Sequence, residues 1–195
     1  MTKLNETLEH AHATSGSWGR GSSWRFVDGV HELSDQLVSA VFSLALAEDA
    51  LIFTRNQRAR WELLGGHIEP GESIEQALCR EALEEGGVNL DYWSRFGHIE
   101  VQNDGSAINP STQAPYAPLG YVLFFVGISA RPLMPPTGIE VTGVSRVPLA
   151  QLQQLAELQG ANLEIIHRGL LVMTELLEKQ GVDASPILKY LATIL

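Results

Sequence analysis

Apolar runs separated by short polar breaks predict a series of strands along the chain. Residues 37–46 and 50–54 are largely apolar, and the Glu48-Asp49 pair between them predicts a tight turn joining two strands. Residues 121–128 form a continuous apolar run, which is typical of a central strand covered on both faces. Shorter strand patterns occupy residues 96–101 and 144–147. These segments predict a sheet whose central strand is covered on both faces.

Helical patterns alternate with these strands and dominate the end of the chain. Ser73 and Gln76 form a capping-box pair, so a helix is predicted to begin at residue 74 and to end at Gly86-Gly87. Further helices are expected over residues 149–158, 162–180 and 185–195. The apolar residues of the late helices exceed what one face hides: Ile165, Ile166, Leu170, Leu171, Met173, Leu176 and Leu177. These helices either cover the core of their own chain or pair with a second subunit, so a homodimer is an open alternative.

Three glutamates gather in the last turn of the helix predicted at residue 74. Glu81 and Glu85 continue its apolar stripe and Glu84 flanks them, so like charges three and four residues apart repel one another. They also lie at the negative end of the helix dipole. A run of glutamates is often a solvated face, but this one continues the inward stripe. A hard cation that takes oxygen ligands, Mg²⁺ or Mn²⁺, removes these penalties together and also binds phosphates.

The same stretch, residues 66–88, resembles the Nudix box. The matching positions are Gly66, Glu72, Arg80, Glu81, Glu84, Glu85, Gly87 and Val88, with Ala82 in the aliphatic slot. The resemblance implies a Nudix-type α/β/α sandwich with a mixed sheet and a helical C-terminal extension. It also implies metal-dependent hydrolysis of a pyrophosphate bond in a nucleoside diphosphate linked to another group.

The resemblance also assigns roles to individual residues. It implies that Glu81, Glu84 and Glu85 bind the metal and carry the catalysis, with the carbonyl of Gly65 as a further ligand. Glu140 lies where the family often supplies an extra acid, and Glu100 and Asp104 are rivals for that role. Which carboxylate accepts the proton of water is left open.

Other residues are candidates for support and for substrate contact. Glu72 and Arg80 have opposite charges that can bridge loop and helix and hold the metal ligands, unless they form an ordinary surface pair. Substrate contacts are expected from Arg55, Arg58, Arg60, Trp61 and Tyr116. For the arginines and Trp61 the alternative is a basic hairpin tip with one packed aromatic residue. His67 is expected to be a loop residue, with a substrate contact as the alternative.

Composition limits the partners of the chain. Its 195 residues, 45% of them hydrophobic, suffice for one core with extensions. A net charge of −10 argues against an extended nucleic-acid or anionic membrane surface, because such partners need clustered Lys and Arg. A small nucleotide stays compatible, because a metal supplies positive charge locally. Cys79 is the single cysteine and is expected to be a packing residue, which suits a reducing cytoplasm.

The chain is expected to be divided into three parts. Residues 1–37 form an N-terminal extension, with a flexible stretch at 14–23; residues 38–152 form the Nudix domain; and residues 153–195 form the helical extension. The start shows no signal peptide and no run is long enough to span a membrane, so we expect a cytoplasmic protein. Nucleoside triphosphates, nucleotide sugars and ADP-ribose are all open as substrates. The alternatives to an enzyme are a non-catalytic nucleotide-binding or regulatory module and an assembly role for the last helices.

Overall fold

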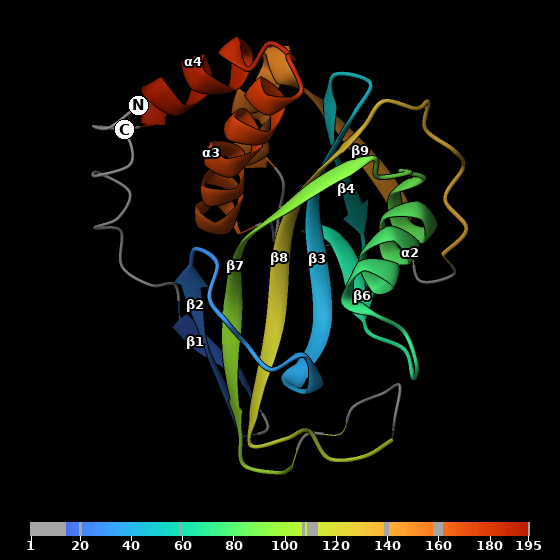
Figure 1. Ribbon diagram of the computed structural model, residues 1–195, viewed down its shortest axis with the longest axis vertical. Helices are drawn as coiled ribbons and strands as arrows, with labels where there is room; N and C mark the ends of the chain where they lie inside the picture. The colour runs from blue at the N-terminus through green and yellow to red at the C-terminus, as the bar shows by residue number, and fades with distance from the viewer. Residues whose placement is uncertain are drawn as a thin grey trace.

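The computed structural model describes residues 15–19, 21–58, 60–106, 108, 113–138, 141–157 and 162–194, with only the backbone for residues 16–19, 156 and 157. Within them, a mixed sheet lies between α2 on one face and α3 with α4 on the other (Figure 1). The strands are β1 (Ser15–Gly19), β2 (Ser22–Asp28), β3 (Val38–Ala47), β4 (Ala50–Arg55), β5 (Trp61–Glu62), β6 (Leu64–His67), β7 (Tyr92–Asn103), β8 (Leu119–Ser129) and β9 (Gly143–Pro148). The helical segments are η1 (Asp35–Leu37), α2 (Ile74–Gly86), η2 (Leu149–Glu157), α3 (Leu163–Lys179) and α4 (Ser185–Ile194). The expected α/β class is confirmed.

Strand β8 lies at the centre of the sheet, as its apolar run predicts. The order is β1-β2-β7-β8-β3-β4-β5, with β6 also paired to β3 and β9 to β4. β8 is parallel to β3 and antiparallel to β7, which makes the sheet mixed. β3 and β4 meet at the Glu48-Asp49 turn, as the sequence predicts. Both turn residues have positive φ.

Alternating side chains of β3 face two separate cores. Leu44 and Leu46 face the core beneath α3, together with the buried side chains of Ile166 and Leu170. Val41 belongs to the other core, beneath α2. Apolar residues on both faces of one strand explain why residues 37–46 do not show a simple alternation of polar and apolar positions.

Helix α2 begins and ends where the sequence predicts. The Ser73 side chain accepts a hydrogen bond from the Gln76 backbone and the Gln76 side chain accepts one from the Ser73 backbone, so the capping box is formed. Gly87 ends the helix in the left-handed conformation. Ala77 and Leu78 are buried against the sheet. This packing fixes the direction of the glutamates one turn further along.

The N-terminal region corrects one prediction, because the stretch expected to be flexible contains a hairpin. β1 pairs with β2, and β2 pairs with residues 97–103 of β7. Phe26 of β2 is buried against Phe96 and Phe124. The many Gly and Ser residues conceal a strand signal whose burial alternates from Ser22 onward. Residues 1–14 lie outside the described part of the chain.

The C-terminal helices pack on their own chain. Asn162 caps α3 by accepting a hydrogen bond from the backbone of Ile165, and the helix ends before Gly181, as predicted. α3 crosses β7 and β8, and α4 contacts α3 and η2 (Figure 1). The helix expected at 149–158 is instead a 3-10 segment, interrupted by non-helical backbone at Gln151. The division of the chain into three parts stays a prediction.

Candidate active site

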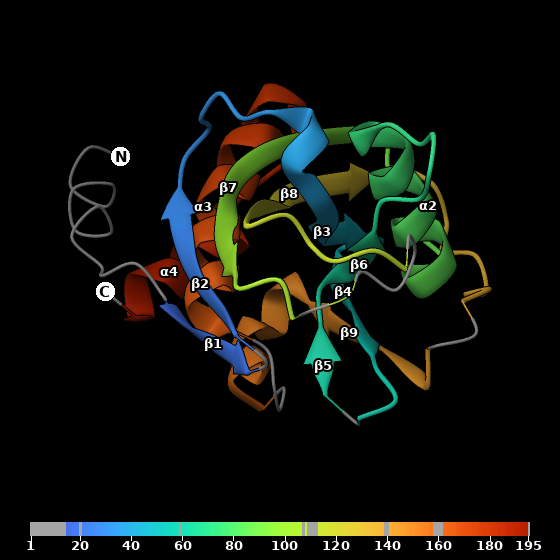
Figure 2. The same ribbon diagram turned by 90° about the horizontal axis from the view of Figure 1, so that it is seen from below.

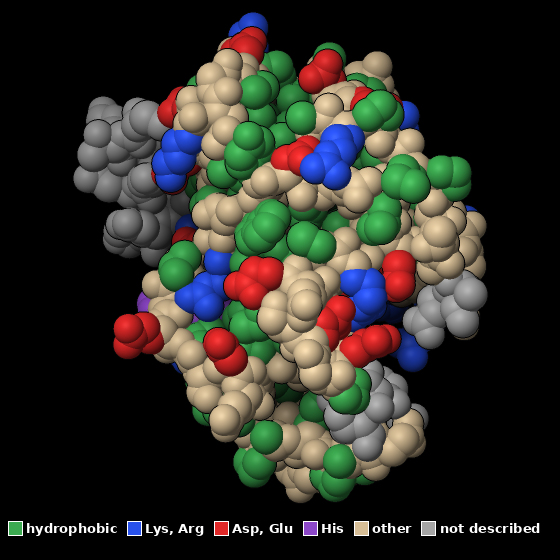
Figure 3. Space-filling model, turned by 45° about the vertical axis from the view of Figure 1, so that its right-hand side comes forward, with side chains coloured by type: hydrophobic (Ala, Val, Ile, Leu, Met, Phe, Trp, Pro, Cys, Tyr) green, Lys and Arg blue, Asp and Glu red, His purple; other side chains and the backbone are tan. Residues whose placement is uncertain are grey.

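The last turns of α2 bring the three glutamates to one side of the helix. The side chain of Glu81 is 12% exposed and that of Glu84 is 43% exposed. Arg80 Nη1 donates to Oε1 of Glu81 at 2.9 Å and to Oε2 of Glu84 at 3.3 Å. Burial raises the pKa of Glu81, although Arg80 opposes the shift. Figure 3 shows acidic side chains gathered around basic ones on the side of the molecule that carries α2.

Glycines of β6 allow the strand to approach these glutamates closely. The backbone N–H of Gly65 donates to Oε2 of Glu85 at 2.9 Å. A Cβ atom on Gly66 would lie 2.4 Å from Oε1 of Glu81, so only glycine leaves room for the carboxylate in this position. Gly65 itself faces the β3 backbone, because a Cβ there would lie 2.1 Å from the carbonyl oxygen of Val41. The two glycines therefore set the distance between strand and helix.

Arg80 and Glu72, the pair expected to bridge the loop and the helix, are in direct contact. Arg80 Nε donates to Oε1 of Glu72 at 2.8 Å and Nη2 donates to Oε2 at 2.9 Å. Nη2 also donates to the carbonyl of His67 at 3.0 Å. These bonds lower the pKa of Glu72 and raise that of Arg80. One guanidinium thus joins the loop before α2, strand β6 and two of the glutamates.

The chemistry of this donor set fits a hard divalent cation. Among the residues that the structure describes, no three His, Cys, Asp or Glu side chains already form a metal-binding cluster, and the Arg80 guanidinium pairs with Glu81 and Glu84. The side-chain atoms that these glutamates offer to a metal are nevertheless all oxygens, which Mg²⁺ prefers as ligands. The half-buried Glu81 carboxylate, whose charge is disfavoured by burial, is the kind of group that a cation stabilises.

The other acidic candidates lie elsewhere or outside the description. Glu140 lies outside the described residues, but the N–H groups of Thr137 and Gly138 donate to the carbonyl of Glu84, so the segment before it lies against the end of α2. Glu100 pairs with Arg25 between β7 and β2. Asp104 accepts a hydrogen bond from the backbone of Ser106 in the loop after β7. Neither contacts the α2 glutamates in the described part of the chain.

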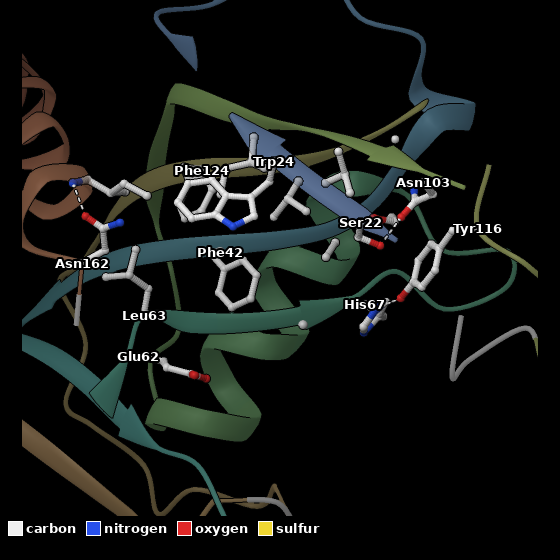
Figure 4. A pocket seen from close by; sticks show the side chains of 18 of the residues that line it. Ser22, Trp24, Phe42, Glu62, Leu63, His67, Asn103, Tyr116, Phe124 and Asn162 are labelled. Carbon is white, nitrogen blue, oxygen red and sulfur yellow. Dashed lines mark hydrogen bonds between the residues drawn. The ribbon is translucent and has the colours of Figure 1, made fainter. Parts of the chain in front are cut away.

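A cavity of about 510 Å³ opens on the face of the sheet opposite α2 (Figure 4). Its walls are mostly apolar and aromatic, as expected for a small-molecule site. The aromatic side chains lining it are Trp24, Phe42, Trp61, Tyr116 and Phe124. The polar ones are Ser22, Ser39, Glu62, His67, Asn103 and Asn162.

Sequence reasoning identified only part of this cavity. Trp61 and Tyr116, two of the residues predicted to contact a substrate, line it. Arg55 instead lies over the Trp61 ring, with Cζ 5.7 Å from the ring centroid. The backbone N–H groups of Arg58 and Arg60 donate to Asn56 at the β4–β5 turn, and their side chains are exposed. The structure therefore does not place the three arginines along the cavity.

His67 lies in a strand and lines the cavity, which its position in the Nudix box did not indicate. It ends β6, lines the cavity, and forms a hydrogen bond between Nε2 and the hydroxyl of Tyr116 at 2.5 Å (Figure 4). Burial raises the pKa of Tyr116. The expectation of a loop residue is therefore corrected, because His67 belongs to β6 and joins it to the segment before β8. The alternation of β6 brings the ring to the cavity.

Strand β6 connects the cavity with the α2 carboxylates. Gly66 lines the cavity, and the position of its missing Cβ lies against Glu81. A molecule bound in the cavity therefore has only a glycine backbone between it and a carboxylate of α2. The view along the sheet from below places β6 between β3 and α2 (Figure 2).

Comparison with known proteins defines the family. The NUDIX domain family matches residues 36–169, and the chain belongs to this family. The match runs past the domain end expected at residue 152 and into α3. The described helices include none long and apolar enough to cross a membrane.

Individual relatives match over shorter segments. The oxidized purine nucleoside triphosphate hydrolase of Mus musculus is 43% identical over 47 residues, which are 24% of this chain and 30% of that protein. The curated relatives compared are matched over 28 to 44% of their own lengths.

Solved structures share the fold. The pyrophosphohydrolase BsRppH of Bacillus subtilis, solved as a point mutant, has a TM-score of 0.51 and 15% identity, covering 68% of this chain and 76% of that one. The NUDIX domain of Shewanella oneidensis NrtR, solved with ADP ribose, has a TM-score of 0.52 and 16% identity, covering 70% and 88%. At these identities the likeness concerns the fold alone.

Proposed function

We propose that this protein hydrolyses a pyrophosphate bond in a nucleotide, with the nucleoside in the cavity and the phosphates passing over Gly65 and Gly66 toward α2. The observation that carries the proposal is that Gly66 borders both the cavity and Glu81. A nucleotide has the same two-part character, because its base is flat and largely apolar and its phosphates are anionic. The match to an oxidized purine nucleoside triphosphate hydrolase supports this substrate class.

Glu81, Glu84, Glu85 and the carbonyl of Gly65 are the residues that would hold Mg²⁺ or Mn²⁺. When bound, the metal supplies charge neutralisation for the phosphate oxygens and lowers the pKa of a water ligand. Glu140, outside the described residues, is a further ligand in this proposal, because the segment before it lies against the end of α2. Glu72 acts through Arg80 by keeping the guanidinium against α2.

The reaction needs a water molecule and a proton acceptor. The water oxygen bonds to phosphorus, the bond to the bridging oxygen breaks, and the departing phosphate or phosphorylated group keeps the bond's electron pair. One of the α2 carboxylates, Glu81, Glu84 or Glu85, accepts the proton in this proposal. The aromatic walls hold the base, and the hydrogen-bonded His67–Tyr116 pair lines the same cavity.

A substrate panel tests the proposal. Nucleoside triphosphates, ADP-ribose, nucleotide sugars and dinucleoside polyphosphates are each incubated with Mg²⁺, with Mn²⁺ and with chelator, and the products are separated by chromatography. Metal-dependent cleavage of one class is the expected result. Ligand-dependent thermal stabilisation with no cleavage throughout the panel would replace the enzyme by a nucleotide-binding module. The same proposal takes the partner to be a small nucleotide in the cytoplasm.

A further inference from the structure

Glu62 is the one charged side chain among the described residues that line the cavity. It belongs to β5 and is half-buried, and Figure 4 shows its carboxylate on the cavity side of the strand. Burial raises its pKa, while Asn56, Arg60 and Arg58 oppose the shift. The mechanism above does not use this carboxylate. A half-buried carboxylate beside aromatic walls is costly unless hydrogen-bond donors compensate it.

The fold holds Glu62 in one orientation. Asn56 Nδ2 donates to Oε1 of Glu62 at 2.7 Å. Asn56 is itself fixed, because its Oδ1 accepts the backbone N–H groups of Arg58 at 2.9 Å and Arg60 at 3.1 Å. The amide can therefore offer only its NH₂ group to the glutamate. Oε2 of Glu62 has no hydrogen-bond partner in the described part of the chain. This oxygen is therefore available to accept a hydrogen bond from a ligand.

Asn162 adds a donor to the same cavity. Its Oδ1 accepts the backbone N–H of Ile165 at 3.2 Å at the start of α3, which leaves its NH₂ group for a ligand. The polar pattern is an anionic acceptor from β5 and a neutral donor from α3. A complementary ligand edge carries N–H groups together with a carbonyl oxygen.

We propose that Glu62 selects the base of the substrate, and that the base it favours has the guanine edge, with a ring N–H, an exocyclic amino group and a carbonyl oxygen. This inference rests on the proposed function, since it places the nucleoside in the cavity. Glu62 accepts from the ring N–H and the amino group, and Asn162 donates to the carbonyl. Adenine presents a lone pair where guanine presents the ring N–H, so it places an acceptor against the carboxylate.

The spacing along the strands agrees with this assignment. Three residues lie between Glu62 and Gly66, so their Cα atoms are at most about 13 Å apart in an extended chain. A nucleotide with its base edge at Glu62 therefore reaches the glycine border, beyond which the α2 carboxylates lie. Trp61 and Phe42 offer flat surfaces between these two points.

Nucleoside binding tests the inference without hydrolysis. Guanosine, inosine and adenosine carry no phosphate, so their affinities can be measured by calorimetry in the presence of chelator. Wild-type protein is expected to bind guanosine about 10- to 100-fold more tightly than adenosine, as hydrogen bonds to a charged group permit. Inosine, which lacks the amino group, is expected to fall between them.

Matched variants assign the preference to Glu62. Glu62→Gln is expected to lose most of the preference for guanosine, whereas Glu178→Gln, an exposed site on α3, should keep it. Glu62→Asp retains the charge and serves if the glutamine variant does not fold. Equal binding of guanosine and adenosine by the wild type, or an unchanged preference in both Glu62 variants, would overturn the proposal.

The two proposals fail separately. Glu84→Gln should keep the nucleoside preference and lose hydrolysis, because Glu84 belongs to α2 and is not among the residues that line the cavity. A guanosine preference without hydrolysis of any substrate would overturn the proposed reaction and leave the role of Glu62 standing. Hydrolysis without a base preference would overturn the role of Glu62 and leave the proposed reaction standing.

Discussion

The guanidinium of Arg80 donates two hydrogen bonds to the carboxylate of Glu72, with Nε 2.8 Å from Oε1 and Nη2 2.9 Å from Oε2. The two side chains are 23% and 13% exposed, so solvent screens the pair only in part. The pair ties the loop before α2 to the helix. Because Arg80 also contacts Glu81 and Glu84, the same guanidinium sets the geometry of the proposed metal ligands.

Replacing Arg80 by lysine should therefore harm both stability and activity. Lysine keeps the charge but cannot form the paired hydrogen bonds. We expect Arg80→Lys to lower the free energy of unfolding by about 1–2 kcal/mol, measured by urea denaturation, and to reduce kcat. Arg131→Lys is the matched control, because Arg131 pairs with Asp91 at an exposed site and should change stability by less than about 0.5 kcal/mol. Equal losses in the two variants would show that Arg80 is an ordinary surface residue.

Adding one methyl group at Gly66 should affect activity more than stability. The new Cβ meets the end of the Glu81 side chain, which can rotate away, so Gly66→Ala is expected to fold. The displaced carboxylate should lower kcat by at least about tenfold, since small misplacements at a reacting centre are costly. Gly143→Ala, where a Cβ meets only ordinary contacts beginning at 3.8 Å, should retain activity. Wild-type kcat in Gly66→Ala would contradict the placement of Glu81.

Acid should destabilise the fold partly through His98. The ring is 2% exposed, and burial, with contributions from His31 and Arg95, lowers its pKa below the ordinary value of about 6.5. The folded state then binds fewer protons than the unfolded state, so stability is lost as pH falls below about 6.5, toward the lowered folded pKa. Urea unfolding of His98→Gln should show a smaller loss than wild type between pH 7.5 and 5.5.

Some acid sensitivity should persist in that variant. Burial also lowers the pKa of His167, which contacts Tyr190 at the α3–α4 contact, and its contribution has the same sign. His167→Gln is therefore the companion measurement. If His98→Gln loses as much stability as wild type over this range, burial of His98 is not a source of the acid sensitivity.

The site on α2 was predictable because its information is local. The capping box at Ser73, the stop at Gly87 and the glutamates between them all fall within one helix and its flanks. Local hydrogen bonds of this kind determine where the helix begins and ends. The strands that flank the Glu48-Asp49 turn were predictable for the same reason.

The cavity was not predictable because its walls come from distant parts of the chain. Trp24 enters from the N-terminal hairpin, Phe124 from the central strand and Asn162 from the start of α3. Only the pairing of β2 with β7 brings Trp24 to this face, and that register has no local signal. The orientation of Glu62 was not predictable either, because it depends on the hydrogen bond from the Asn56 side chain.

The central claim, that the α2 carboxylates carry metal-dependent hydrolysis, is tested most directly by the Mg²⁺ dependence of nucleotide hydrolysis in Glu84→Gln, compared with wild type and Glu178→Gln. The glutamine variant keeps the side-chain volume but removes one charged ligand. We predict a loss of kcat of at least about 100-fold, with folding judged intact by thermal unfolding and full activity in Glu178→Gln. Unchanged turnover and Mg²⁺ dependence in Glu84→Gln would contradict the account.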